Sequence, residues 1–170
     1  MEPGSAMNHI ILIGLPGSGK TTVGRLLAQR LGLPFADSDE ALERDLGCTI
    51  PEIFAQRGEG FFRDEEARTL RMLCAQTRQV IATGGGAVLR EENRALLRRS
   101  GRVIFLDRAP CDIAVGLDAA GRPLLQHNTL EELAAQRRQF YLDCAHVTIR
   151  EGRALEAAEC IMALERKETR

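Results

Sequence analysis

The chain has 170 residues, with 23 Lys and Arg against 24 Asp and Glu and a formal net charge of −1. This length suits one domain with a substantial core, and the balanced charge argues against non-specific binding to nucleic acid or to a membrane surface. The apolar runs are only as long as strands, which excludes a transmembrane helix.

Targeting and redox signals are weak. Residues 1–8 are small and polar and lack the apolar core of a secretory signal, so we expect a disordered start to a single domain over 1–170. Five cysteines are scattered without a C-x-x-C pair, and the three histidines make no metal-ligand spacing. We therefore expect reduced thiols and a cytoplasmic location. The small size and balanced charge of the chain favour a monomer.

Apolar runs alternate with helical patterns along the chain. The runs predict strands over 9–14, 34–37, 79–83, 102–107 and 146–150. Helical spacing predicts helices near 19–31, 39–46, 59–76, 91–99, 110–117, 129–144 and 153–166. This alternation is typical of an α/β domain with a parallel sheet. Residues 117–128 fit neither period, so we interpret them either as an active-site lid or as a plain surface loop.

The first strand runs into a phosphate-binding sequence. Residues 14–21 read GLPGSGKT and fit the pattern G-x-x-x-x-G-K-[ST] between a buried strand and a helix. Its glycines let successive backbone N–H groups point inward, and the helix N-terminus adds partial positive charge. Lys20 would reach the outer phosphates and the Thr21 hydroxyl would ligate Mg²⁺. The pattern predicts binding of a nucleoside triphosphate.

Two carboxylates follow the second strand, in the sequence FADSD at 35–39. Side chains two apart on extended backbone face the same way, so we expect Asp37 and Asp39 to point together into the ligand edge of the sheet. One would hold Mg²⁺ or its waters, and the other would accept a hydrogen bond from an acceptor hydroxyl. The alternative is a helix N-cap, a role that Asp39 could fill by itself.

An arginine and a glycine turn come next. Arg63 and Glu66 are three apart on a predicted helix and can pair, which would preorganise the guanidinium for a substrate carboxylate. The alternative is a surface ion pair of little value. Residues 84–86 are three glycines after a strand, so either a group approaches their backbone closely or they simply turn a corner.

Taken together, the motifs resemble the shikimate kinase family. They run in order as GLPGSGKTTVG at 14–24, FADSD at 35–39, GEGFFRDEE at 58–66, TGGGAV at 83–88, RPLL at 122–125 and Arg137 four residues before Tyr141. The resemblance implies a P-loop NTPase fold of the nucleoside-monophosphate-kinase group. That fold has three αβα layers, a five-stranded parallel sheet and a mobile lid, here at 109–127. It also implies transfer of the γ-phosphoryl of ATP to the 3-hydroxyl of shikimate, on the route to chorismate and the aromatic amino acids.

The resemblance also implies residue roles. The phosphates would be bound by Gly17, Ser18, Gly19, Lys20, Thr21 and Thr22. Thr21 would ligate Mg²⁺, with Asp37 supporting the metal through water. Asp39 would bind the ring hydroxyls as the candidate base, Arg63 and Arg137 would hold the shikimate carboxylate, and the Gly85 backbone would contact the ring. Arg122 would reach the transferring phosphate, and Arg153 would lie near adenine.

One departure from the family pattern stands out. The family's lid usually carries further basic residues before RPLL, whereas residues 109–121 contain none. We therefore expect a lower affinity for ATP than is usual in the family. Two other functions remain open: a kinase for another small hydroxy acid such as gluconate, and a ligand-sensing module without turnover. Arg63 and Arg137 argue against a neutral acceptor, because it would leave two guanidinium groups unpaired. A ligand-sensing module would normally need an attached output domain.

Overall fold

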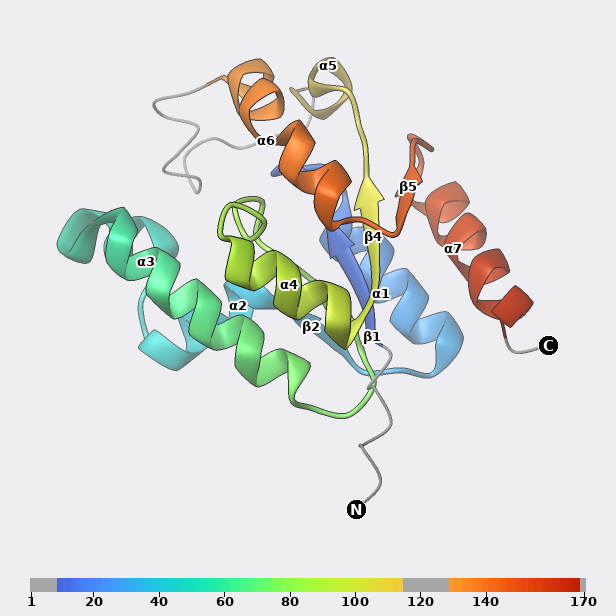
Figure 1. Ribbon diagram of the computed structural model, residues 1–170, viewed down its shortest axis with the longest axis horizontal. Coiled ribbons are helices and arrows are strands. Elements are labelled where there is room, and N and C mark those ends of the chain that lie inside the picture. Colours follow the sequence, from blue (N-terminus) through green and yellow to red (C-terminus); the bar gives the residue numbers. More distant parts are fainter. Residues whose placement is uncertain (1–8, 115–128, 169–170) are drawn as a thin grey trace.

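A five-stranded parallel sheet forms the centre of the molecule (Figure 1). The computed structural model describes residues 9–114 and 129–168. In these ranges the strands are β1 His9–Ile13, β2 Phe35–Asp37, β3 Val80–Ala82, β4 Gly101–Leu106 and β5 Val147–Ile149. Their order across the sheet is β2-β3-β1-β4-β5, with Ile11 of β1 opposite Ile81 of β3 and Val103 of β4. All five predicted strands are confirmed.

Helices cover both faces of the sheet, which confirms the three-layer α/β fold (Figure 1). Helices α1 Lys20–Leu31 and α7 Ala154–Glu168 pack on one face, where Ile10 and Leu12 of β1 contribute to a core with residues of both helices. Helices α3 Ile50–Cys74, α4 Glu91–Ser100 and α6 Leu130–Cys144 lie on the other, over Ile11 and Ile13. Strand β1 is fully buried because its alternating side chains supply both cores.

The segment between β2 and β3 differs from the prediction. Helix α2 Ser38–Leu46 agrees with it, but α3 begins at Ile50 rather than near 59. Thr49 and Glu52 form a reciprocal capping box there, a start signal that the hydrophobic spacing did not reveal. Gly58, at φ 78°, interrupts the helix, and α3 kinks at this point. Both stretches of α3 contribute to a core with α2, and the second stretch, after the kink, carries Arg63.

The remaining predicted elements agree where the structure describes them. Helix α5 covers Pro110–Ala114, the described part of the helix expected over 110–117. The expected disordered start at 1–8 lies outside the described residues, as do Arg122 and most of the expected lid at 109–127. In the described ranges, no helix combines the length and apolar character that a bilayer crossing requires.

Candidate active site

The phosphate loop joins β1 to α1 at the carboxyl edge of the sheet. Gly17 and Gly19 have φ angles of 78° and 94°, which L side chains rarely adopt, so these positions need glycine. Lys20 is the first residue of α1, and its buried Nζ donates to the backbone oxygens of Gly14 at 2.9 Å and Leu15 at 2.7 Å. The ammonium group is therefore held along the loop, where a phosphate oxygen could accept from it.

Asp37 combines the two roles that the sequence left as alternatives. Its Oδ2 accepts a hydrogen bond from the Thr21 hydroxyl at 2.7 Å. Its Oδ1 accepts from the backbone N–H groups of Asp39 at 3.0 Å and Glu40 at 3.4 Å, so Asp37 rather than Asp39 is the N-cap of α2. One carboxylate thus fixes the start of a helix and places an oxygen beside Thr21.

The predicted reason for the proximity of Asp37 and Asp39 is wrong. Strand β2 ends at Asp37, and Asp39 lies in the first turn of α2 rather than on extended backbone. Both side chains nevertheless line one cleft of about 500 Å³, because the helix starts directly at the edge of the sheet. The cleft is lined by Gly17, Gly19, Lys20, Thr21, Thr22, Asp37, Asp39, Glu40, Glu43, Ile50, Thr83 and Gly85.

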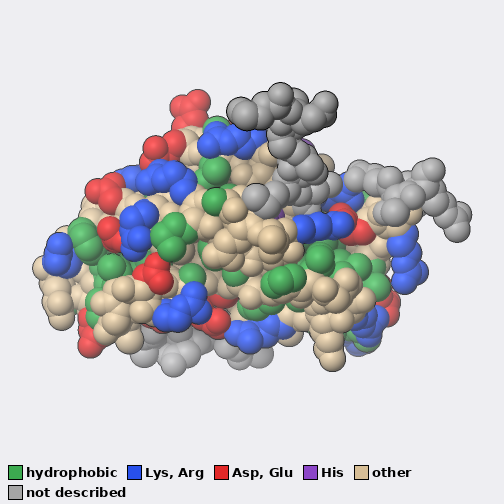
Figure 2. All heavy atoms as spheres, turned by 90° about the horizontal axis from the view of Figure 1, so that it is seen from below, with side chains coloured by type: hydrophobic (Ala, Val, Ile, Leu, Met, Phe, Trp, Pro, Cys, Tyr) green, Lys and Arg blue, Asp and Glu red, His purple; other side chains and the backbone are tan. Residues whose placement is uncertain are grey.

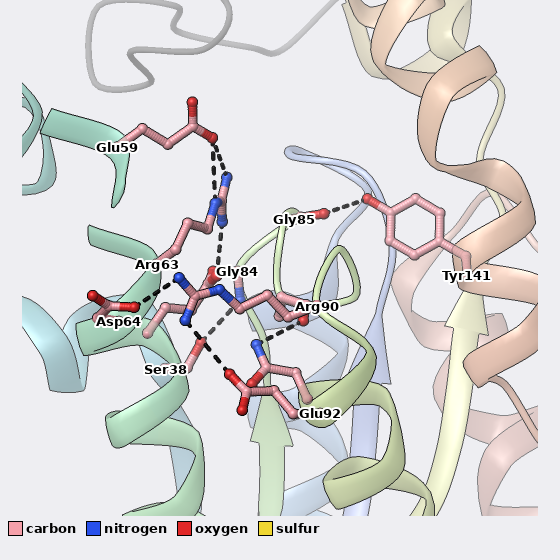
Figure 3. A network of polar contacts seen from close by, with 12 residues as sticks. Ser38, Glu59, Arg63, Asp64, Gly84, Gly85, Arg90, Glu92 and Tyr141 are labelled. Atoms are coloured by element: carbon pink, nitrogen blue, oxygen red, sulfur yellow. Dashed lines mark hydrogen bonds and ion pairs between the residues drawn. The ribbon is translucent and has the colours of Figure 1, made fainter. Parts of the chain in front are cut away.

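The glycine turn after β3 is tightly enclosed, which agrees with the first of the two predicted alternatives, a close approach to its backbone. A Cβ on Gly84 would meet Asp39 Oδ1 and one on Gly86 would meet the Arg63 guanidinium, so the groups that approach this backbone are side chains of the chain itself. The turn is also held by hydrogen bonds (Figure 3). The Gly84 N–H donates to Ser38 Oγ at 2.9 Å, and the Tyr141 hydroxyl donates to the Gly85 oxygen at 2.6 Å.

Arg63 is buried, not a surface residue. Only 7% of it is exposed, and its Nη1 donates to Glu66 Oε2 at 2.7 Å, where Glu66 is 2% exposed. The predicted pairing is confirmed, and the surface alternative is wrong. Nε and Nη2 both lie 3.3 Å from Oε1 of Glu59, whose side chain is half exposed (Figure 3). Glu66 holds the guanidinium from inside and Glu59 from the solvent side.

A second arginine reaches the same region from α6. Arg137 is 4% exposed, and its charge acts on both Glu66 and Tyr141. Burial raises the pKa of the Glu66 carboxyl, and the charges of Arg63 and Arg137 oppose that rise. Burial likewise raises the pKa of Tyr141 to about 12, so its hydroxyl keeps the proton that it donates to Gly85. Two buried guanidinium groups therefore act on Glu66, Arg63 through a direct ion pair and Arg137 through its charge.

Arg153 lies at a second, smaller pocket. It lines this pocket together with Ser18 and Gly19, at the point where α7 begins near the phosphate loop. Its guanidinium is exposed, and its Nη1 lies 3.7 Å from Glu156 Oε1. No group of three or more His, Cys, Asp or Glu side chains that could hold a metal occurs within 9–114 and 129–168.

Sequence reasoning missed the residues that hold the glycine turn. Ser38 and Tyr141 come from segments far from it along the chain, and only folding brings them to Gly84 and Gly85. A signal for Tyr141 did exist: it is the only tyrosine and lies one helical turn after Arg137. Ser38, between the two aspartates, offered no comparable signal.

Comparison with known proteins identifies the family. The sequence model of shikimate kinase matches residues 16–165. The chain belongs to the shikimate kinase family. It is 53% identical to the shikimate kinase of Symbiobacterium thermophilum, over 83% of this chain and 85% of that protein. It is 44% identical to the shikimate kinase of Ralstonia nicotianae, over 94% of this chain and 86% of that protein.

Solved structures agree with this shikimate kinase assignment. The shikimate kinase from Acinetobacter baumannii in complex with shikimate superposes with a TM-score of 0.89 at 38% identity, covering 95% of this chain and 94% of that one. The shikimate kinase from Aquifex aeolicus superposes with a TM-score of 0.79 at 35% identity, covering 92% and 96%. The family resemblance of the motifs and the predicted fold are both confirmed.

Proposed function

We propose that this member of the shikimate kinase family transfers the γ-phosphoryl group of ATP to the 3-hydroxyl of shikimate, releasing ADP and shikimate 3-phosphate. One observation carries the proposal. The glycine turn lies against the phosphate loop at Pro16, against Asp39 and against the Arg63 guanidinium. A phosphate cradle, a carboxylate and a carboxylate-binding arginine therefore meet around one short stretch of backbone.

The nucleotide half of the cleft would bind the phosphates through the backbone of Gly17, Ser18 and Gly19 and through Lys20 and Thr22. Thr21 and Asp37 fit a Mg²⁺ ion, because they place a hydroxyl and a carboxylate oxygen 2.7 Å apart in residues that line the cleft beside the phosphate-loop glycines. Thr21 would ligate the metal directly and Asp37 through water. When bound, Mg²⁺ would offset the negative charge of the β- and γ-phosphates.

The acceptor half would hold the ring acid. Arg63 and Arg137 would bind its carboxylate, and the Gly85 backbone would contact the ring. Asp39 would then orient the 3-hydroxyl and accept its proton while the oxygen attacks the γ-phosphorus and the bond to ADP breaks. Phosphoryl transfer asks a protein mainly for such positioning and charge neutralisation. From the family motif we assign Arg122 to the transferring phosphate, and we assign Arg153 to the vicinity of adenine.

We further propose that the protein acts as a cytoplasmic monomer of one domain over 1–170. Its moderate length supports this, as does the mixing of acidic and basic side chains over the face in Figure 2. Light scattering coupled to size exclusion checks the monomer, since a mass of twice 18.7 kDa would contradict it.

A coupled assay of ADP release over a panel of hydroxy acids tests the function. We expect turnover that requires both shikimate and Mg²⁺, and none in the Lys20→Ala variant. Turnover with gluconate but not with shikimate would overturn the substrate assignment. Nucleotide and shikimate binding without any ADP release would favour the ligand-sensing alternative.

A further inference from the structure

The positive charge around the nucleotide is unevenly distributed along the chain. Arg108 follows β4 by two residues, and the sequence after it contains no Lys or Arg from 109 to 121. The carboxyl ends of the strands form the edge at which parallel sheets bind ligands. Given the proposed function, we propose that Arg108 binds the polyphosphate of the nucleotide and supplies charge that the segment after it lacks.

Arg108 borders two hollows, and the phosphate loop borders both. One is the small pocket that contains Ser18, Gly19 and Arg153. The other, of about 360 Å³, lies between β4, α5 and α6 and includes Leu15 of the loop. Arg108 therefore lines both hollows beside the phosphate loop.

Among the arginines near Asp107, Arg108 differs in its partners. Arg138 donates to Asp107 twice, at 2.6 Å and 2.9 Å, and Arg150 Nε lies 3.4 Å from the same carboxylate. Arg108 makes no ion pair within the described part of the chain, and its buried Nε lacks an acceptor there. A buried N–H without an acceptor is costly, and a bound anion would remove that cost.

Ser18 supplies a second, independent indication. It is 2% exposed, and its Oγ also lacks a hydrogen-bond partner in the described residues. Ser18 and Arg108 border the same small pocket from opposite segments, the phosphate loop and the end of β4. A phosphate oxygen accepts from a hydroxyl and from a guanidinium alike, so one ligand group would satisfy both donors.

The side chain can be changed without disturbing the end of the strand. The backbone N–H of Arg108 donates to the Leu106 oxygen at 3.2 Å, and this bond does not depend on the side chain. Methionine at this position keeps the aliphatic stem and removes only the charged head. Arg108→Met therefore tests whether the charge at this position contributes to nucleotide binding, and Arg108→Lys tests whether another positive charge can replace it.

Calorimetry of ADP and adenosine binding separates phosphate contacts from base contacts. For Arg108→Met we expect ADP affinity about tenfold weaker, the effect of one charge-assisted hydrogen bond, and unchanged adenosine affinity. Arg108→Lys should recover part of the loss. In steady-state kinetics the KM for ATP should rise while the KM for shikimate stays constant.

A matched control removes the same charge elsewhere. Arg30 lies in the last turn of α1, at the opposite end of that helix from the phosphate loop, so Arg30→Ala should leave ADP affinity unchanged. ADP affinity of a folded Arg108→Met within twofold of wild type would overturn the proposal. Equal weakening of ADP and adenosine would overturn the assignment to phosphate. Wild-type protein that binds no ADP would instead contradict the proposed function itself.

Discussion

Burial determines how much the charged residues of this protein contribute to its stability. Arg63 has two carboxylate partners, Glu66 inside the fold and Glu59 at the solvent, and the sequence alone does not distinguish them. A charge inside the fold that loses its partner keeps its desolvation cost, whereas an exposed pair is screened by water. The two acidic residues should therefore respond very differently to substitution.

We expect Glu66→Ala to lower the free energy of unfolding by about 3–5 kcal/mol, because Arg63 would remain buried without its inner partner. Glu59→Ala, its matched control on the same arginine, should cost less than about 1 kcal/mol because that pair is longer and half exposed. Urea denaturation of both variants measures the difference. Equal losses of unfolding free energy would show that the buried Glu66 does not stabilise Arg63 more than the exposed Glu59 does.

Arg63 itself should affect one substrate only. Arg63→Ala removes a guanidinium proposed to bind the carboxylate of shikimate, so we expect the KM for shikimate to rise about 30-fold or more. The KM for ATP should stay near wild type, since the phosphate loop does not contact Arg63 in the proposed complex. A matching loss of ATP affinity would show that Arg63 is misassigned.

At the scale of elements, the start of α2 and the kink in α3 position residues of the proposed site. The N-cap of α2 is the residue that accepts from Thr21, and the second stretch of α3 carries Arg63 after the kink at Gly58. Hydrogen bonds at helix starts thereby fix the direction from which site residues approach the cleft. Weakening the cap of α3 should lower stability without removing any group from the site, because neither Thr49 nor Glu52 is a proposed site residue.

Thr49→Ala tests the capping box of α3. We expect a loss of about 1 kcal/mol of unfolding free energy at neutral pH, typical of an N-cap threonine. The Thr49 backbone N–H, which the variant keeps, and the Thr49 hydroxyl, which it loses, both lower the pKa of the Glu52 carboxyl. The stability that the hydroxyl adds through that carboxylate is present above the unfolded pKa and disappears as the pH falls through the lowered value. The difference between wild type and variant should therefore shrink in acid denaturation series. A difference that grows toward low pH would contradict the cap.

Tyr141→Phe tests the hydrogen bond from α6 to the glycine turn. The substitution leaves the buried Gly85 oxygen without the hydroxyl donor, so we expect a loss of about 1–3 kcal/mol in unfolding free energy. The KM for shikimate should also rise, because Gly85 is proposed to contact the ring. A stable variant with an unchanged KM would show that the turn does not depend on this bond.

At the scale of the molecule, the sheet separates two cores, and its carboxyl edge carries the phosphate loop, Asp37 and the glycine turn after β3. The nucleotide half of the proposed site is built from the β1–α1 loop, and the acceptor half from Asp39 of α2, the arginines of α3 and α6, and the turn after β3. Because each half draws on different elements, each ligand should stabilise the fold independently. Ligand-induced shifts in Tm can therefore separate the two halves.

We expect ADP with Mg²⁺ at 100 times its Kd to add about 2.7 kcal/mol of stability, or roughly 5–10 °C in Tm for a chain of this size. Arg63→Ala should keep the ADP shift and lose the shikimate shift, while Lys20→Ala should do the reverse. Differential scanning fluorimetry provides the measurement. Loss of both shifts in either variant would mean that the two halves are not separate.

The sequence by itself determined the order of strands and helices, the phosphate loop and the family, because hydrophobic period and glycine spacing are local signals. It placed Lys20, Thr21, Asp37 and Asp39 near one another, although through a wrong local geometry for Asp39. Only the tertiary structure decided that Arg63 is buried, that Tyr141 holds Gly85, and that Arg138 and Arg150 contact Asp107 while Arg108 makes no ion pair with any residue in 9–114 or 129–168. These depend on segments far apart in the chain, and burial is a property of the whole packed fold, which no local pattern encodes.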